Sequence, residues 1–355
     1  MTMQDTRPIR IDLVSDTATR PTPGMRRAMA EAPVGDEQRD EDPSVNALTA
    51  RVAELLGQEE AIFLPSGTMC NQIALAVHCR PGDEIIAAEN AHIVTSEGAG
   101  SAVFASSVIR PIHSERGIFS GREVAAFARG AYAKAPRTRV VAVEQTNNRG
   151  GGSVWPLETL SEVVTVASEL KLVLHMDGAR LLNAVVATGI SARQYASPFD
   201  SVWLDLSKGL GCPVGGVLAG SAAFIREADV WKHRFGGAMR QAGILAAAGL
   251  YALDNHVDRL AEDHANARLF GALIGALPGI KLDSPEIETN LVFFDVEGTG
   301  KRTPEIAERL LRQGIRIGVE GPTRMRAVTH LDVDEAGIRE AAAALAAATA
   351  ERVSA

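Results

Sequence analysis

The apolar residues of the chain first take on a regular spacing after residue 42. Gly57 is placed to end a predicted helix that begins at 42–44 and carries its apolar residues on one face, at Val45, Leu48, Val52, Leu55 and Leu56. A short apolar run at 61–64 follows directly and has the length of a buried strand. The pattern therefore predicts a helix followed by a strand.

This combination of short apolar runs and amphipathic stretches recurs along the next 160 residues. Further strands are predicted at 84–87, 140–143, 172–174, 202–204 and 217–219, with helical stretches such as 157–170 between most of them. Strands that alternate with helices predict crossover connections and a mostly parallel sheet covered on both faces. The expected fold class is α/β.

The order of elements changes after about residue 255. A long helix at 257–277 leads to a strand at 291–294, a helix at 306–311, strands around Ile315 and Ala327, and an alanine-rich closing helix. Before residue 43, charges and turn formers dominate, as in GDEQRDEDP, which predicts an arm or loop lying over another surface. We therefore expect an N-terminal arm over 1–42, a large α/β domain over 43–255 and a small C-terminal α+β domain over 256–355.

Composition and charge exclude several classes of partner. The 355 residues are 46% hydrophobic and 23% charged, as in globular proteins, and the net charge of −8 comes without a basic stripe that would bind nucleic acid. Since no apolar run approaches about 18 residues and no leader pattern is visible, we expect no membrane contact and a cytoplasmic location. Cys70, Cys79 and Cys212 are too widely spaced for a disulfide framework or a zinc site, so no metal is expected.

Candidate chemistry lies just beyond the predicted strands, where parallel sheets bind their ligands. Directly after the run 202–206 comes Ser207-Lys208-Gly209. A lysine in a partly desolvated site loses its proton readily and becomes nucleophilic enough to form an imine. The apolar strand before Lys208 and the glycines after it disfavour a solvated surface lysine, so we predict that Lys208 carries pyridoxal phosphate (PLP) as a Schiff base. The stretch 209–215 reads GxGxxxG with Pro213 inside it, which disfavours a dinucleotide loop.

Other residues after predicted strands fit the same cofactor. Asp177 is suited to pair with a protonated pyridine nitrogen, although a strand-end Asp also serves as a turn cap. His92 either stacks on an aromatic cofactor or is a hydrogen-bonded loop histidine. Ser66-Gly67-Thr68 opens a predicted helix, where Gly allows close approach and free N–H groups favour a phosphate, or where the turn is a plain helix cap. Arg180 offers a planar fork for a carboxylate.

A series of segments, taken in order, resembles one enzyme family. The segments are SDTATRPTPGM, EDPSVNAL, FLPSGTMCNQIAL, HMDGARLLNA, LSKGLGCPVGG, GGAMRQAGILAAAGLYAL and VTHLDV. With them the chain resembles the low-specificity L-threonine aldolases, which are fold type I PLP-dependent enzymes of the β-eliminating lyase group. The resemblance implies a fold of the PLP-dependent transferase type and a lyase that cleaves β-hydroxy-α-amino acids to glycine and an aldehyde by retro-aldol cleavage.

The resemblance also implies roles for single residues. For the cofactor it implies Lys208 as the Schiff-base lysine, Asp177 as the pyridine partner, His92 as the stacking histidine, and contacts from Ser66, Gly67, Thr68, Arg180, Ser207 and Arg240. For the substrate carboxylate it implies a clamp of Ser15, Arg180 and Arg326. The family forms dimers paired into tetramers, which implies a homo-oligomer with shared active sites in which Arg240 reaches a neighbouring subunit.

Three departures from the family pattern fall on the substrate side. Asn147 stands where the family motif ENTHN has a histidine, and Arg39 stands where DDVYGEDP has a tyrosine. His233 takes the place of a lysine, either as a catalytic proton carrier or as a partly exposed loop histidine. We hypothesise that the substrate is bulkier or acidic, or that the reaction is β-elimination or racemisation. A non-catalytic regulatory protein is disfavoured, because it would not need Lys208 and Asp177.

Overall fold

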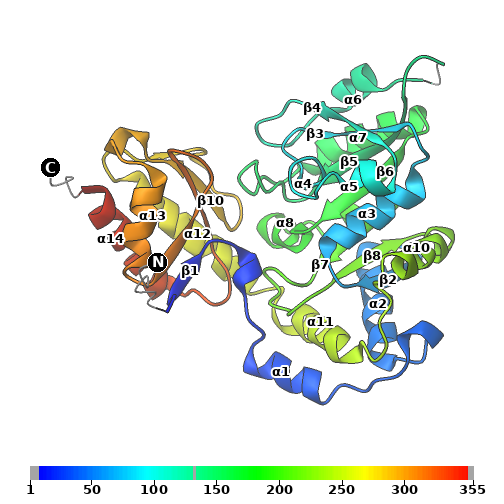
Figure 1. The fold of residues 1–355 in the computed structure, drawn as a ribbon, viewed down its shortest axis with the longest axis horizontal. Helices are drawn as coiled ribbons and strands as arrows, with labels where there is room; N and C mark the ends of the chain where they lie inside the picture. Colours follow the sequence, from blue (N-terminus) through cyan, green and yellow to red (C-terminus); the bar gives the residue numbers. More distant parts are fainter. Residues whose placement is uncertain (1–7, 131–132, 351–355) are drawn as a thin grey trace, which may run out of the picture. The chain divides into compact units, whose positions relative to one another are not determined.

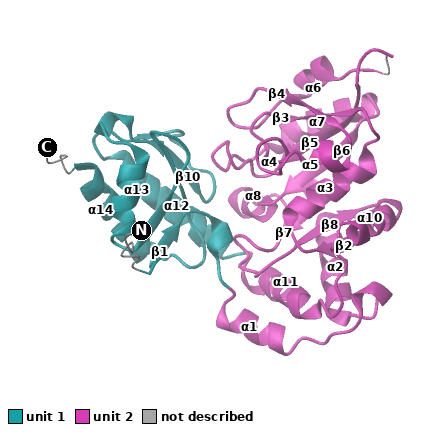
Figure 2. Ribbon diagram, in the orientation of Figure 1, with its two compact units in different colours: residues 1–20, 258–355 teal, residues 21–257 magenta. Residues whose placement is uncertain are grey.

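The computed structural model describes residues 8–130 and 133–350, which form two compact units. The large unit comprises residues 21–257, and the small unit comprises residues 1–20 with 258–355 (Figure 2). The structure therefore places residues of the predicted 1–42 arm in both units, with the division after residue 20. Residues 11–13 form a strand of the small unit, whereas 23–30 form a helix of the large unit. A three-residue strand is too short to show a period, so the pattern of apolar residues does not reveal it.

The large unit is built on a seven-stranded sheet (Figure 1). Of the seven strands in this sheet, β8 alone runs opposite to the other six, which confirms the predicted mostly parallel sheet. The strand order is β2 (Glu60–Leu64), β8 (Gly216–Gly220), β7 (Ser201–Asp205), β6 (Val173–Gly178), β5 (Arg137–Glu144), β3 (Asp83–Ala88) and β4 (Val108–Ile112). The sequence pattern does not predict β4, an edge strand that is mostly exposed or half-buried and contains Pro111.

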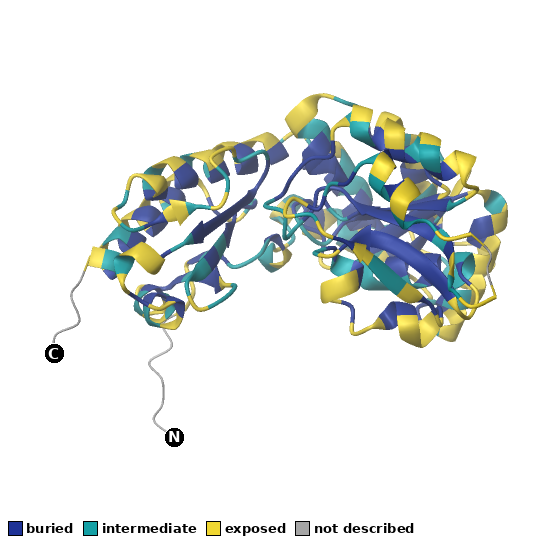
Figure 3. Cartoon of the chain, turned by 90° about the horizontal axis from the view of Figure 1, so that it is seen from above, coloured by how far each residue is buried: buried dark blue, intermediate teal, exposed yellow. Residues whose placement is uncertain are grey.

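Helices cover both faces of this sheet. Every residue of β3, β6, β7 and β8 is buried, and because successive side chains point to opposite faces, both faces must be covered (Figure 3). The helices are α1 (Pro23–Ala30), α2 (Pro43–Leu56), α3 (Gly67–His78), α4 (His92–Thr95), α5 (Gly100–Phe104), α6 (Gly121–Phe127), α7 (Leu157–Glu169), α8 (Leu181–Thr188), α9 (Ala192–Ala196), α10 (Ala222–Arg234) and α11 (Gly243–Asn255). A short 3-10 helix, η2, spans Glu37–Arg39.

The start of α2 shows how local chemistry sets an element. Asp42 caps the helix by accepting hydrogen bonds from the backbone N–H groups of Ser44 and Val45, and Gly57 ends it with φ 71°. Asp42 also accepts from the N–H groups of Gly35 and Gly243. One buried carboxylate thus fixes the helix and ties it to two loops.

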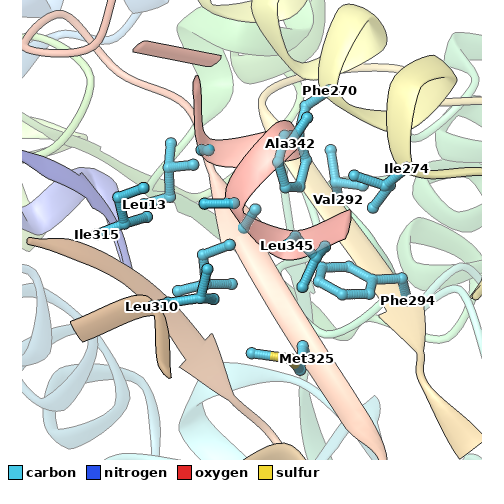
Figure 4. Close-up of a cluster of buried hydrophobic side chains, with 14 of the residues drawn as sticks. Leu13, Phe270, Ile274, Val292, Phe294, Leu310, Ile315, Met325, Ala342 and Leu345 are labelled. Carbon is cyan, nitrogen blue, oxygen red and sulfur yellow. The ribbon is translucent and has the colours of Figure 1, made fainter. Parts of the chain in front are cut away.

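The small unit is an α+β domain, as predicted. Its sheet has the order β1 (Ile11–Leu13), β11 (Ile315–Val319), β12 (Arg324–Val328), β10 (Leu291–Asp295) and β9 (Lys281–Leu282). Its other elements are α12 (Leu260–Gly275), α13 (Thr303–Leu311), α14 (Glu335–Ala350), η1 (Asp16–Ala18) and η3 (Glu297–Thr299). The core packs Phe270 and Leu345 from the helices against Phe294 and Leu13 from the strands (Figure 4). Within the described ranges, no helix combines the length and apolarity needed to cross a membrane.

Candidate active site

Acidic residues gather at one edge of the large sheet, where β5, β6 and β7 end. Glu144 lies beside Asp177 in the pairing of β5 with β6, and Asp177 lies beside Trp203 in the pairing of β6 with β7. Asp205 is the last residue of β7, and Lys208 follows three residues later. The predicted positions after the strands are therefore brought to the same edge, as expected for parallel strands.

Lys208 is held by a carboxylate that sequence reasoning did not single out. Its Nζ lies 2.8 Å from Asp205 Oδ2, and Asp205 Oδ1 accepts from both the backbone N–H and the hydroxyl of Ser207. The lysine side chain is 17% exposed, so it is partly desolvated as predicted. The signal that could have identified Asp205 is that it is an acid inside the otherwise apolar run 202–206.

Trp203 is the centre around which the expected cofactor residues gather. A Cβ on Gly67 would collide with its indole ring, so only glycine lets the first turn of α3 approach this closely. Lys208 Nζ lies 5.7 Å from the centre of the ring, and the indole N–H donates to Asn71. Trp203 therefore places the start of α3 beside the end of β7.

The turn at the start of α3 has the geometry of a helix cap, which was one of the two predicted uses of its residues. Ser66 is the helix cap, and its hydroxyl accepts from the N–H of Met69. Gly67 and Thr68 are the first two residues of the helix. The first turn of a helix has unpaired N–H groups and the positive end of the helix dipole, both of which suit a phosphate.

Asp177 is 4% exposed and has a different partner for each carboxylate oxygen. Oδ1 accepts from the N–H of Ala179, which is the turn-cap role, and Oδ2 accepts from Asn71 Nδ2 at 2.9 Å. The carboxylate is thus fixed in orientation at the sheet edge. This rigidity suits a group that must face a single ring nitrogen.

His92 opens α4 and lies between two buried glutamates. Its backbone N–H donates to Glu144 Oε2, and its Nδ1 is 2.7 Å from Glu97 Oε1. The hydrogen bond to Glu97 raises the pKa of His92. Burial, with the charge of Asp177 adding to it, raises the pKa of Glu144 to about 7. His92, Glu144 and Asp177 all line one small cavity.

Glu97 and Asn71 are buried polar residues that sequence reasoning missed. Asn71 Nδ2 donates to Glu97 Oε1 at 2.7 Å as well as to Asp177. The signal for Asn71 was a polar residue, next to Gln72, in the mostly apolar stretch 69–77. His92, Glu97 and Asp177 present three ligand atoms within 4.8 Å of one another, but an amide N–H points at both carboxylates and satisfies them without a cation.

Asn147 and Arg180 lie beside this edge. Asn147 is fully buried, and its side chain closes the loop after β5 by accepting from the N–H of Gly150 at 2.7 Å and by donating to Glu144 at 3.4 Å. Arg180 is 6% exposed, precedes α8 and donates its backbone N–H to the carbonyl of Gln145. Asn147 therefore has a structural role in this loop.

Arg39 and Arg240 come together around Asp36. Arg240 Nη1 lies 3.0 Å from Asp36 Oδ2, and Arg39 Nε lies 3.8 Å from the same oxygen. Both arginine side chains are largely exposed. Beneath them, Glu37 forms a buried ion pair with Lys232 of α10. The structure thus joins these two predicted residues to each other, in a cluster separate from the contacts of Lys208.

His233 and the two residues in the small unit have local partners. His233 is half-exposed and lies 4.0 Å from Asp229, as the partly exposed alternative requires, but it stands in α10 and not in a loop. Ser15 caps η1 by accepting from the N–H of Thr17. Arg326 of β12 pairs with Glu320 at 3.3 Å and donates to the carbonyl of Val14, next to Ser15. Ser15 and Arg326 are therefore neighbours within the small unit.

Known proteins resemble the chain over nearly its whole length. Residues 12–297 match the model of the β-eliminating lyase family. The low-specificity L-threonine aldolase of Escherichia coli K12 is 41% identical over 334 residues, which is 94% of this chain and 97% of that protein. The low-specificity L-threonine aldolase 1 of Arabidopsis thaliana is 37% identical, over 90% of this chain and 91% of its own length.

Solved structures share the fold at lower identity. The threonine aldolase of Leishmania major superposes with a TM-score of 0.81 at 21% identity, covering 96% of this chain and 100% of that one. A serine palmitoyltransferase variant of S. paucimobilis with bound PLP gives a TM-score of 0.76 at 15% identity, covering 96% of this chain and 87% of that one. These likenesses show the fold.

Proposed function

Because the chain belongs to the β-eliminating lyase family, and within it to the low-specificity L-threonine aldolases, we propose that it cleaves β-hydroxy-α-amino acids with PLP. The products are glycine and an aldehyde, formed by breaking the Cα–Cβ bond of a substrate of the L-threonine or L-allo-threonine type. The observation that carries this proposal is the gathering of Gly67, Lys208 and the Asn71–Asp177 pair around Trp203.

The residues at this edge fit PLP in their chemistry. The first turn of α3, with Ser66, Gly67 and Thr68, would hold the phosphate, and Ser207 and Arg240 would add contacts. Asp177 would face the pyridine nitrogen, and Lys208 is the amine that would hold the aldehyde carbon. When bound, PLP supplies an electron sink for the carbanion at Cα.

The protein's own residues would orient the substrate and move its protons. Arg180 and Arg326, with the hydroxyl of Ser15, are proposed to clamp the α-carboxylate and so decide which bond at Cα is broken. His92 has Nδ1 tied to Glu97, which leaves Nε2 to take up or release a proton near the substrate. His233 is a second proposed proton carrier.

The assay that tests the function follows three products. The full-length protein with PLP is incubated with L-threonine and with L-allo-threonine, and acetaldehyde, ammonia and D-amino acid are measured. We expect acetaldehyde and glycine in equal amounts. Ammonia without glycine would instead indicate β-elimination, and D-amino acid would indicate racemisation. If a protein that binds PLP gave none of these products, the regulatory alternative would replace the enzyme.

The replacement of Arg39 by tyrosine tests the substrate side. The Arg39 side chain is 72% exposed, and its ion pair with Asp36 is long at 3.8 Å, so the guanidinium is available to pair with an acidic substrate side chain. We expect R39Y to lower kcat/KM for an acidic β-hydroxy amino acid by about tenfold relative to L-threonine, as for a lost charge-assisted hydrogen bond. Arg51, another exposed arginine in an ion pair, gives the control variant R51Y. An unchanged preference in R39Y would refute this role.

Assembly and location are also proposed from the family. We propose a dimer of dimers in which Arg240 completes the site of a neighbouring subunit, in agreement with the 63% exposure of its side chain. Light scattering on the purified protein should give the mass of four chains, and the mass of one chain would contradict it. The protein is proposed to be cytoplasmic, with small amino acids rather than nucleic acids or membranes as its partners.

A further inference from the structure

Two of the proposed cofactor contacts, Asp177 and His92, are joined by two buried groups, Asn71 and Glu97, that have no assigned contact with cofactor or substrate. Asn71 Nδ2 bridges Asp177 Oδ2 and Glu97 Oε1, and Glu97 Oε1 in turn bonds His92 Nδ1. The side chain of Glu97 is 2% exposed, and Asn71 is 0% exposed. We propose that Glu97 is a positioning residue that sets the orientation and charge of His92 and, through Asn71, supports Asp177. This inference rests on the proposed function.

The geometry allows only one orientation of the central amide. Asn71 Oδ1 accepts from Trp203 Nε1 at 2.7 Å and lies 3.0 Å from His175 Nε2. An indole nitrogen only donates, so the oxygen of Asn71 must face Trp203 and its NH₂ group must face the two carboxylates. Glu97 and Asp177 are therefore both held as acceptors by one rigid, fully buried donor.

Glu97 provides the acceptor that the His92 ring needs. Because Nδ1 is bound to Glu97, the ring orientation is fixed and Nε2 is the nitrogen left for other partners. The hydrogen bond to Glu97 raises the pKa of His92, and burial raises the pKa of Glu97. The hydrogen bond to Glu97 therefore keeps His92 protonated up to a higher pH than an isolated imidazole.

Three other ionisable groups, Asp177, Glu144 and Cys70, influence the pair of His92 and Glu97. Asp177 and Glu144 are both acidic and add to the raised pKa of His92. Cys70, on α3, also interacts with Glu97 and Asp177, but burial raises the pKa of its thiol, so it stays neutral. Among these acids, Glu97 is the one that bonds the imidazole nitrogen directly.

The test replaces Glu97 by glutamine in the full-length protein, which keeps an acceptor oxygen but removes the charge. Diethylpyrocarbonate modifies only neutral imidazole, so the rate at which it modifies His92 reports the ionisation of that ring. This rate is measured across a range of pH by peptide mass spectrometry, before and after PLP is added. We expect the pH at which His92 is half-protonated, the His92 midpoint, to be lower in E97Q. We also expect PLP, titrated by its visible absorbance, to bind about tenfold more weakly. E97D keeps the charge and should lie between E97Q and the unmodified protein in both measurements.

An exposed pair of the same chemistry serves as the control. His113 Nδ1 lies 2.5 Å from Glu89 Oε1, but the two side chains are 80% and 44% exposed, so solvent competes with the bond. E89Q should leave the His92 midpoint, PLP affinity and aldolase rate unchanged. If E97Q behaved like E89Q in the first two measurements, the positioning role would be overturned. If the unmodified protein bound no PLP or released no aldehyde, only the proposed function would fail, because the His92 midpoint does not depend on turnover.

Discussion

Replacing Lys208 by alanine is expected to lower the aldolase rate at least about 10³-fold, since no other group would take over its covalent role. The substitution also removes the cation that lies 2.8 Å from Asp205, a residue that is 6% exposed. A loss of activity in K208A alone would therefore mix chemistry with stability.

Lys208→Arg separates these two effects. A guanidinium keeps the positive charge beside Asp205 but does not form the imine, so K208R should keep the fold and lose the reaction. Steady-state acetaldehyde release, visible absorbance after PLP addition and thermal unfolding are measured on both variants. If K208R kept normal turnover, or kept the visible absorbance band of the PLP-bound protein, the proposed role of Lys208 as the Schiff-base lysine would be refuted.

Lys232→Met is expected to lower stability by about 3–5 kcal/mol, because it leaves the buried carboxylate of Glu37 without its cation. The two side chains are 4% and 5% exposed. Glu37 Oε1 also accepts from the N–H of Met239, while Oε2 has no hydrogen-bond partner among the described residues. Among the described residues, Lys232 is the one cation that pairs with Glu37.

Removing both partners of this pair should cost much less than removing one. We expect K232M with E37L to recover most of the lost stability in thermal unfolding, since a buried ion pair gains little over apolar residues that fill its space. Arg51→Met breaks an exposed pair with Asp254 and should change stability by less than about 1 kcal/mol. A K232M protein as stable as R51M would contradict the prediction.

Much of the sheet and the central site was predictable from local patterns. Strands buried on both faces read as short apolar runs, which identified β3, β5, β6, β7 and β8. The parallel strands among them end at one edge of the sheet, so Lys208, Asp177 and His92 could be proposed as neighbours from their positions after those runs.

Residues that act through partners far along the chain were not predictable. Asn71 and Glu97 show no local pattern beyond a buried polar group and a loop acid, and their roles arise only where α3, α4 and β6 meet. The strand β1 was missed because its pairing with β11 joins distant parts of the chain. Local periodicity reports whether a side chain is buried, but not what it contacts.

The identity of each residue and the order of the motifs can be read without a structure. The sequence by itself therefore determined the family, the expected cofactor with Lys208, and the three positions that depart from the family pattern, which are Asn147, Arg39 and His233. Only the tertiary structure decided that Asp205 holds Lys208, that Asn71 joins Asp177 to Glu97, and that Asp36 joins Arg39 to Arg240. The physical reason is that hydrogen bonds and ion pairs depend on distances of about 3 Å between side chains. Packing creates those distances between elements that the sequence leaves far apart.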